Sequence, residues 1–342
     1  MRVALCQALV GIAAGVMMAV APSLAFAKDL SPAQQRAQLM DGVKSWGYQL
    51  QRLDIPALAA SPFDLLVIDH APDRVESVEL LFRRNELEPL KVKPNGSRRL
   101  LLAYVSIGEA ERYRYYWDET WLAGSSCPSW LGPVNPQWVG NYPVEYWQPA
   151  WQSIIFGQTD SYLDRVLAAG FDGIYLDRAD VYEQFKDRPA AKAEMIAFLA
   201  RLMDHARTLK PDTVFVLQNA EELLREKGVR DRIDGAAKES LYFNADAAAS
   251  ATPNEDRNSV KADLRIAKKA GRKVMVVEYL DDSAKGLAAR KQAEKDGFLI
   301  HFAERTLSVL NDSDLPRPAS ELLRPIVRAN NDPQVSRSRP CG

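Results

Sequence analysis

The sequence predicts a single-domain (β/α)8 TIM barrel, α/β in class, with a long aromatic-rich loop after its third strand. Eight short apolar runs, many of them β-branched, are expected to be strands, at residues 46–51, 64–70, 99–108, 171–177, 213–220, 235–243, 273–280 and 297–303. Stretches with helical spacing lie between most of them. Continuous apolar strands that alternate with helices indicate a parallel sheet covered on both faces, and eight of them predict closure into a barrel.

The helices are expected where apolar residues recur every three or four positions. Residues 190–210, "AAKAEMIAFLARLMDHARTLK", show this pattern most clearly, and residues 75–84 and 258–271 share it. A doubly wound open sheet is the alternative fold. Such a sheet usually carries a glycine-rich phosphate turn after its first strand, and "WGYQLQRLD" has none. The barrel is therefore favoured.

Both ends of the chain are expected to lie outside the barrel. Residues 1–27 have one early basic residue, then an apolar run, then Ala25-Phe26-Ala27, which is the layout of a cleaved secretory signal. A membrane anchor is the alternative, but the apolar run is short and Pro22 interrupts it. We expect a signal peptide at 1–27, a lead-in at 28–45, the barrel at 46–330 and a tail at 331–342. The mature protein is then secreted or periplasmic and free of the membrane.

Charge and cysteine content narrow the classes of function. The chain has 44 Lys and Arg against 45 Asp and Glu, and this balance favours neither nucleic-acid nor membrane-surface binding. Cys6 belongs to the predicted signal. Cys127 and Cys341 are a candidate disulfide pair in an oxidising compartment, with two independent thiols as the alternative.

Acidic residues follow the carboxyl ends of the predicted strands, where barrels of this kind carry their active sites. The stretch "GFDGIYLDRADVYE" places Asp177 at the end of a buried strand and Asp180 three residues later. Other polar residues at strand ends are Asp69, His70, Ser106, Glu109, Glu111, Gln218, Asn219, Glu221, Glu222, Glu239, Ser240, Glu278, Tyr279, Asp281 and Asp282. One such acid is more often a helix cap, but the set predicts an acid-ringed mouth.

Two chemistries suit such a mouth. Glycoside hydrolysis needs a pair of carboxyl groups, and Mg²⁺-assisted chemistry needs acids around the metal together with a lysine or histidine base. His205 and His301 fall within a predicted helix and a predicted strand, so only His70 is available as a base. HExxH and GxSxG patterns are missing as well. We expect no metal and no cofactor, and glycoside hydrolysis is favoured.

An aromatic-rich stretch follows the third strand. It contains six of the seven tryptophans, and tyrosines are interleaved with them: Trp117, Trp121, Trp130, Trp138, Trp147, Trp151, Tyr113, Tyr115, Tyr116, Tyr142 and Tyr146. Aromatic rings beside a barrel mouth can stack on sugar rings while their polar edges form hydrogen bonds. About two-thirds of these rings are expected to pack the loop, leaving two or three for ligand.

Several motifs resemble the endo-α-1,4-polygalactosaminidase family of glycoside hydrolases (GH114) and its barrel relatives. They are "YVSIGEAERYRYYW", the "W…P…W…NYPVEYW" loop, "GFDGIYLDRADVY", "LQNAEELL" and "KESLYF", and the resemblance covers most of residues 45–305. It implies a (β/α)8 barrel that hydrolyses an α-1,4-linked galactosamine-rich exopolysaccharide. It also implies a catalytic Asp at the fourth strand end and a Glu after the fifth, which match Asp177 and Glu222.

Glu221 and Glu222 compete for the second catalytic role. If Asn219 caps the following helix, Glu222 occupies the third helical position, where a capping-box acid belongs. The family spacing, with the acid before Leu223-Leu224, still favours Glu222. Successive helical residues point about 100° apart, so only one of the two acids can face the substrate.

The resulting hypothesis is an endo-acting, retaining glycosidase with Asp177 as nucleophile and Glu222 as general acid/base. Expected substrate contacts are Asp69, Tyr104, Glu109, Glu111, Tyr142, Asp180, Asn219, Glu221, Glu239 and Tyr279. A cationic galactosamine polymer would suit an acidic mouth. Retention is expected because neighbouring parallel strands lie about 4.8 Å apart, close to the roughly 5–5.5 Å between the carboxyl groups of retaining enzymes. The alternatives are a barrel that binds exopolysaccharide without cleaving it and, third, the Mg²⁺-dependent enzyme.

Overall fold

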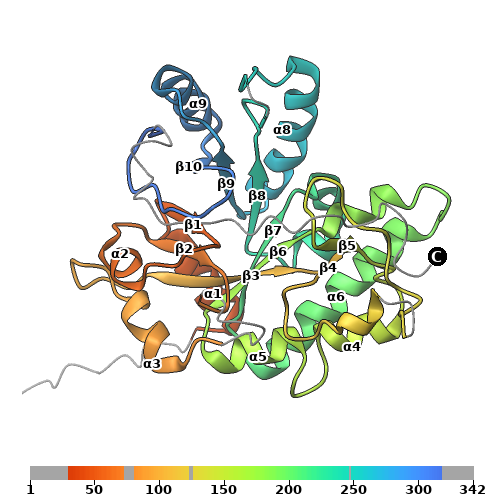
Figure 1. The fold of residues 1–342 in the computed structure, drawn as a ribbon. Helices are drawn as coiled ribbons and strands as arrows, with labels where there is room; N and C mark the ends of the chain where they lie inside the picture. The colour runs from red at the N-terminus through yellow and green to blue at the C-terminus, as the bar shows by residue number, and fades with distance from the viewer. Residues whose placement is uncertain (1–29, 73–80, 123–125, 246–247, 318–342) are drawn as a thin grey trace, which may run out of the picture.

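Eight parallel strands form a nearly closed barrel with helices between them, which confirms the predicted fold (Figure 1). The computed structural model describes residues 30–72, 81–122, 126–245 and 248–317. The barrel strands are β1 (Trp46–Gln49), β2 (Leu65–Ile68), β3 (Leu100–Ser106), β6 (Gly173–Asp177), β7 (Val214–Gln218), β8 (Gly235–Glu239), β9 (Lys273–Glu278) and β10 (Leu299–Phe302). They pair in this order, and β1 lies beside β10. Each of the eight predicted runs contains one strand.

The helices alternate with the strands along the chain. They are α1 (Pro32–Asp41), α2 (Ile55–Ala60), α3 (Arg84–Leu87), α4 (Pro149–Ile155), α5 (Tyr162–Ala169), α6 (Ala191–Leu209), α7 (Lys227–Arg230), α8 (Asn254–Lys269) and α9 (Ser283–Asp296). Short 3-10 helices are η1 (Glu88–Lys91), η2 (Glu119–Trp121), η3 (Ala179–Gln184) and η4 (Glu221–Arg225). The predicted helices at 190–210 and 258–271 correspond to α6 and α8. Most of the helix predicted at 75–84 lies outside the described residues. Within those residues no helix is both long and apolar enough to cross a membrane.

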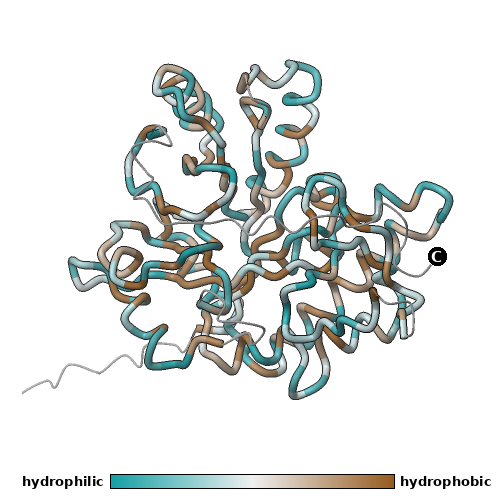
Figure 2. Tube along the Cα trace, viewed as in Figure 1, coloured by the Kyte–Doolittle hydropathy of each residue, from teal (hydrophilic) through white to brown (hydrophobic). Residues whose placement is uncertain are grey.

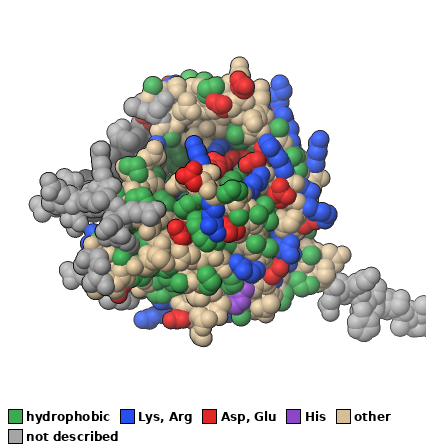
Figure 3. Space-filling model, turned by 90° about the vertical axis from the view of Figure 1, so that its right-hand side faces the viewer, with side chains coloured by type: hydrophobic (Ala, Val, Ile, Leu, Met, Phe, Trp, Pro, Cys, Tyr) green, Lys and Arg blue, Asp and Glu red, His purple; other side chains and the backbone are tan. Residues whose placement is uncertain are grey.

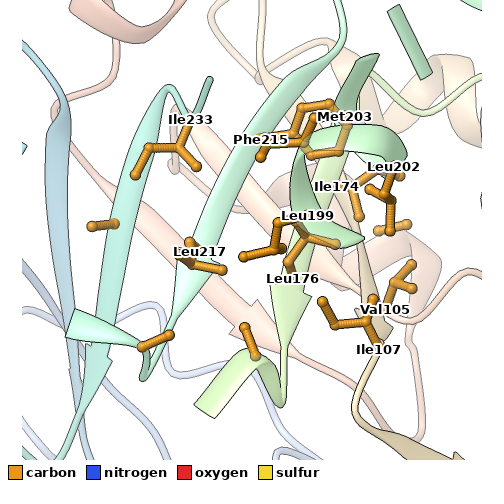
Figure 4. Packing of buried hydrophobic residues seen from close by; sticks show 14 of the residues in the cluster. Val105, Ile107, Ile174, Leu176, Leu199, Leu202, Met203, Phe215, Leu217 and Ile233 are labelled. Atoms are coloured by element: carbon orange, nitrogen blue, oxygen red, sulfur yellow. The ribbon is translucent and has the colours of Figure 1, made fainter. Parts of the chain in front are cut away.

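The strands bury both faces because alternate side chains point to opposite sides of a strand. On β6, Ile174 and Leu176 face outward and pack against the Leu199 side of α6 (Figure 4). Tyr175 faces inward, where its ring lies 5.3 Å from that of Tyr48. Hydrophobic residues accordingly follow the central strands, whereas the outer turns are more hydrophilic (Figure 2). The last inward position on β6 belongs to Asp177.

The described part of the lead-in, residues 30–45, packs against the barrel. Ser31 caps α1 by accepting a hydrogen bond from the backbone of Gln34. Met40, near the end of this helix, is buried inside the barrel and contacts the start of β8 at Gly235. Helix α1 therefore closes the amino-terminal end of the barrel. The predicted signal at 1–27 and the tail at 331–342 lie outside the described residues.

The long loop after the third barrel strand is anchored by a small antiparallel pair, β4 (Glu109–Glu111) with β5 (Asn141–Pro143). Gly108 precedes β4 at a point of close approach, because an added Cβ would lie 2.1 Å from the carbonyl oxygen of Arg178. Any larger residue at 108 would push the loop away from the residue that follows Asp177. The glycine of "SIGEAE" thus sets the distance between the loop and the barrel mouth.

Candidate active site

The carboxyl end of the barrel carries a layer of polar side chains. On β6, β7 and β8 the last side chain that points into the barrel is polar, and the inward side chain two residues earlier is apolar or aromatic. On β8, for example, these residues are Glu239 and Ala237. The residues of this layer are Asp69, Tyr104, Asp177, Gln218, Glu239 and Tyr279. They line a cavity of about 1190 Å³, larger than the roughly 300–1,000 Å³ of typical small-molecule pockets. Figure 3 shows a hollow on this side of the molecule with acidic and basic side chains in its walls.

Asp177 is held by two donors from the neighbouring strands. Its Oδ2 accepts a hydrogen bond of 2.7 Å from the Tyr104 hydroxyl, and its Oδ1 accepts one of 3.1 Å from Nε2 of Gln218. Only 8% of Asp177 is exposed. Burial, and next the charge of Asp177, raise the pKa of Tyr104 well above its ordinary value. Tyr104 therefore keeps its proton and can hold the carboxylate in one orientation.

Glu239 lies on the same wall of the cavity, two strands along from Asp177. Its Oε2 accepts a hydrogen bond of 2.6 Å from Nδ2 of Asn219, and its Oε1 accepts one from the Tyr279 hydroxyl. Burial raises the pKa of Glu239, and the negative charge of Asp177 raises it further. A carboxyl group with a raised pKa, in the same cavity as a second one that is held by hydrogen-bond donors, is the arrangement that acid catalysis of glycoside hydrolysis requires.

Glu222 was expected to face Asp177, but it does not line the cavity. It lies in η4, where Oε1 pairs with Lys192 at 2.8 Å and Oε2 accepts a 3.2 Å hydrogen bond from Tyr182. Its side chain is 43% exposed. The hydrogen bond from Lys192 lowers the pKa of Glu222, the opposite of what a proton donor needs. Glu221 also lies outside the cavity lining and pairs with Lys238 at 3.2 Å.

The conformation of Asn219 explains why Glu221 and Glu222 lie outside the cavity lining. It was expected to cap the following helix, but Ala220 occupies that position, and Asn219 adopts a left-handed conformation with φ of 56°. Its side chain is directed to the neighbouring strand, where it donates to Glu239 and accepts from the Glu239 backbone N–H. Asn219 therefore positions Glu239, in addition to lining the cavity.

The same backbone turn recurs on three neighbouring strands. Arg178, Asn219 and Ser240 have φ of 63°, 56° and 53°, and each directly follows a residue that lines the cavity. Positive φ is uncommon outside glycine and tends to cluster at functional sites. Each strand therefore ends abruptly once its last polar side chain has been placed at the mouth.

Two arginines that the sequence did not single out neutralise much of the acidic ring. Arg114 is 2% exposed in its side chain and pairs with Glu111 at 2.6 Å and Asp69 at 2.9 Å. Arg178 pairs with Glu109 at 3.2 Å and with Asp180 at 3.1 Å. The side chains of Asp177 and Glu239, in contrast, accept hydrogen bonds from neutral groups, namely Tyr104, Gln218, Asn219 and Tyr279. The two arginines therefore pair with the acids that surround Asp177 and Glu239.

The remaining predicted contacts divide into two groups. Asp69, Glu109 and Glu111 line the cavity, so their contact with substrate stays a prediction. Tyr142 does not, because it is 1% exposed and stacks on Trp117 with 4.9 Å between ring centroids. Asp180 lies outside the lining, beside Arg178. Its pKa is raised to about 7, mainly by burial.

The aromatic loop mainly packs on the barrel. Of its six tryptophans, Trp138 lines the cavity, whereas Trp130 and Trp151 are buried with 5.0 Å between their ring centroids. Tyr113 of the same loop also lines the cavity, so two of its rings are available to ligand. The sequence did not single out Tyr48, whose inward position on β1 brings it to the cavity floor. Cys127 is disulfide-bonded. Cys341 lies outside the described residues, so its pairing with Cys127 stays a prediction.

The histidines are used structurally. His70 is fully buried between Arg114 and Tyr162, with Nδ1 at 3.2 Å and 3.1 Å from them. Burial lowers the pKa of His301 to about 3, so this residue is neutral. Across the described ranges no three His, Cys, Asp or Glu side chains come together as a metal site.

Glu278 holds the turn that follows Glu239. It is fully buried at the end of β9, and its two carboxyl oxygens accept hydrogen bonds from the backbone N–H groups of Tyr242 at 2.8 Å and Phe243 at 3.2 Å. These residues belong to the turn that follows Glu239. The next residue, Tyr279, contacts Glu239 directly. The end of β9 therefore fixes both the turn and the side chain.

We expect Glu278→Gln to destabilise the protein by about 1–3 kcal/mol, because an amide N–H would face a buried backbone N–H and leave it unsatisfied. The free energy of unfolding in urea measures this. Glu255→Gln, an exposed change on α8, serves as the control and should stay within about 0.5 kcal/mol of the unmodified protein. Equal stability of the two variants would contradict a clamping role for Glu278.

Comparisons with known proteins agree with the class of protein that the barrel and its carboxyl pair define, a glycoside hydrolase. The model of glycoside-hydrolase family GH114 matches residues 28–316, and the chain belongs to this family. The resemblance seen in the sequence is thereby confirmed.

Two relatives extend the comparison across distant organisms. The chain is 35% identical over 274 residues to an uncharacterized protein of Deinococcus radiodurans, covering 79% of this chain and 83% of the relative. It is 37% identical over 257 residues to an uncharacterized protein of Methanocaldococcus jannaschii, covering 73% and 70%.

Two solved structures share the fold. The glycoside hydrolase domain of PelA from Pseudomonas aeruginosa is 20% identical, with a TM-score of 0.58 over 78% of this chain and 96% of that one. Ega3 of Aspergillus fumigatus, in complex with galactosamine, is 17% identical, with a TM-score of 0.57 over 77% of this chain and 92% of that one.

Proposed function

We propose that this glycoside hydrolase cleaves α-1,4-linked galactosamine-containing polysaccharide, with Asp177 as nucleophile and Glu239 as general acid/base. The observation that carries the assignment is the placement of both carboxyl groups in one cavity, where Tyr104 and Gln218 hold Asp177 and where burial, and next the charge of Asp177, raise the pKa of Glu239. Family membership supports the reaction class, and the galactosamine bound to Ega3 supports the sugar. The signal-like residues 1–27 support export to the periplasm or the medium.

In the proposed reaction Glu239 gives its proton to the glycosidic oxygen while Asp177 attacks the anomeric carbon. The products of this step are a glycosyl-enzyme ester and the released chain end. Glu239, now ionised, then takes a proton from water as the water attacks the ester, which restores both groups. Hydrogen bonds from Tyr104 and Gln218 keep Asp177 aimed into the cavity.

Retention of configuration requires the carboxyl groups of Asp177 and Glu239 to lie close together. Glu239 lies on β8, and β7 separates this strand from β6, so the spacing of adjacent strands no longer applies. Both side chains point toward the barrel axis, where side chains from separated strands converge.

Endo action is proposed from the extent of the cavity. Its lining includes residues that follow strands on all sides of the mouth, from Arg52 after β1 to Thr306 after β10. A chain can cross such a surface without having to end in it. The test is incubation with a galactosamine polymer followed by mass analysis: internal cuts release a ladder of oligosaccharides early. Binding without new reducing ends would favour the non-catalytic alternative.

The dependence of kcat/KM on pH is expected to report the pKa of Glu239. Glu239 must be protonated for the first step, so kcat/KM should fall as the pH rises through its raised pKa. The Tyr279 hydrogen bond to Glu239 lowers that pKa, because it stabilises the ionised form. We expect Tyr279→Phe to move the basic limb of the profile to higher pH. Tyr142→Phe, a matched change outside the cavity lining, should leave the limb in place, and a shift to lower pH in Tyr279→Phe would contradict the role of Glu239.

A further inference from the structure

Trp138 stands apart from the other tryptophans of the aromatic loop. It is 45% exposed, and its neighbour Val139 is 70% exposed. Both line the cavity, at its rim, whereas Asp177 at the floor is 8% exposed. A large apolar surface that remains open beside a binding cavity is a candidate contact for ligand.

Hydrogen bonds fix the conformation of the segment that carries Trp138. The backbone N–H of Asn135 donates to the carbonyl of Asn141 at 2.7 Å, and the N–H of Asn141 donates to the carbonyl of Trp138 at 3.0 Å. The side chains of Asn135 and Asn141 both donate to Glu109, at 2.8 Å and 3.4 Å. Gly140 provides the turn, with φ of 98°. The ring is therefore presented in a defined position, which limits the entropy lost when a ligand binds.

Arg305 brings a positive charge to the same place from the far side of the mouth. It follows β10, and its guanidinium carbon lies 5.7 Å from the centroid of the Trp138 ring. Its Nη1 donates to the carbonyl oxygen of Ala245 at 2.6 Å, so the segment after β8 also fixes it. All three residues line the cavity.

We infer that Trp138 and Arg305 form a subsite at the rim that binds an uncharged, N-acetylated sugar unit of the polymer. The sugar ring packs on Trp138, and the guanidinium donates to hydroxyl or acetamido oxygens, which accept hydrogen bonds. An unacetylated unit carries an ammonium group that the nearby guanidinium repels. At a separation of about 6 Å and with water-like screening at the exposed rim, this repulsion amounts to a preference of at least roughly threefold for the neutral unit. The inference rests on the proposed function and deepens it by naming which sugar the rim accepts.

The experiment measures binding, separately from cleavage. Two α-1,4-linked galactosamine octasaccharides, one fully N-acetylated and one fully deacetylated, are titrated into the Asp177→Asn protein by calorimetry. Trp138→Ala is expected to weaken binding of both by roughly three- to tenfold. Arg305→Glu is expected to lower the ratio of acetylated to deacetylated affinity at least about tenfold, since it replaces repulsion with attraction. Arg305→Gln should give an intermediate ratio.

Lys227→Gln is the control for charge, because Lys227 is 80% exposed in its side chain on α7 and should change neither affinity nor ratio. The same rim substitutions are also made in Glu239→Gln protein, so that the result does not depend on the folding of the Asp177→Asn protein alone. An unchanged affinity ratio in Arg305→Glu, or unchanged binding in Trp138→Ala, would overturn the subsite while leaving the proposed function in place. Failure of both parents to bind either octasaccharide would overturn the subsite and the substrate assignment together.

Discussion

Replacing Glu239 with glutamine is expected to lower kcat by on the order of a thousandfold on the polymer, with little change in fold. Glutamine preserves the shape of the side chain and can still meet Asn219 and Tyr279, but it cannot transfer a proton. The loss in kcat/KM should be much smaller for an aryl glycoside whose leaving group needs no protonation, because kcat/KM reports the first step, which then needs no proton from Glu239. Initial rates on both substrates, with circular dichroism as the check on folding, measure the effect.

Glu222→Gln is the matched control for this prediction. Glu222 pairs with Lys192 outside the cavity lining, so its replacement should keep kcat within about threefold, and Glu221→Gln should behave in the same way. The opposite ranking, with Glu222→Gln inactive and Glu239→Gln near normal, would restore Glu222 as the acid and remove Glu239. The three variants carry the same chemical change, so differences among them report position alone.

The barrel could be predicted from the sequence because its signals are local. A run such as "FDGIYLD" contains both the outward Ile174 and Leu176 and the inward Tyr175 and Asp177, and the alternation of a strand assigns each to a face. Strand β6 follows that alternation. The position of Asp177 at the mouth follows from the strand and its end, and both can be recognised within seven residues.

The acid/base was harder to place because its position depends on where a strand stops. Glu239 was counted among the polar residues at strand ends, but the run 235–243 was expected to continue as a strand for four more residues. The strand ends at Glu239 because Ser240 adopts φ of 53°, and serine has no sequence signature for that conformation. The partner that orients Glu239 is Asn219, twenty residues earlier on another strand. A contact of that separation leaves no periodic trace in one sequence.

The ion pairs of the mouth could not be predicted either, because they join residues that are distant in the sequence. The acids of the mouth could be listed from strand ends, but their neutralisation by Arg114 and Arg178 depends on side-chain directions in three dimensions. Arg114 reaches Asp69 across 45 positions of sequence. An acid count alone predicted a strongly anionic mouth, whereas the two arginines offset the charge of four of these acids. A polymer that is only partly cationic fits that distribution better than a fully deacetylated one.

Asp177→Asn is expected to reduce turnover by on the order of a thousandfold or more while leaving the fold intact. The amide keeps the size of the side chain and can still accept one of the hydrogen bonds from Tyr104 and Gln218, but it has no negative charge with which to attack the anomeric carbon. Added azide should restore part of the activity, because a small anion can occupy the space in front of the amide and act as the external nucleophile. Azide should give no such rescue to the unmodified enzyme.

The configuration of the products then tests whether Asp177 is a nucleophile or a base. If Asp177 attacks the sugar directly, two successive inversions give the unmodified enzyme products that retain the α configuration, whereas the azide adduct of Asp177→Asn undergoes one inversion and is β. A base would need water between the carboxylate and the sugar, with the carboxyl groups roughly 6.5–9.5 Å apart, and would give inverted products from the start. Proton NMR of the first-formed products distinguishes the two cases. Inverted product from the unmodified enzyme would assign Asp177 to the activation of water, and Glu239 would remain the acid in either case.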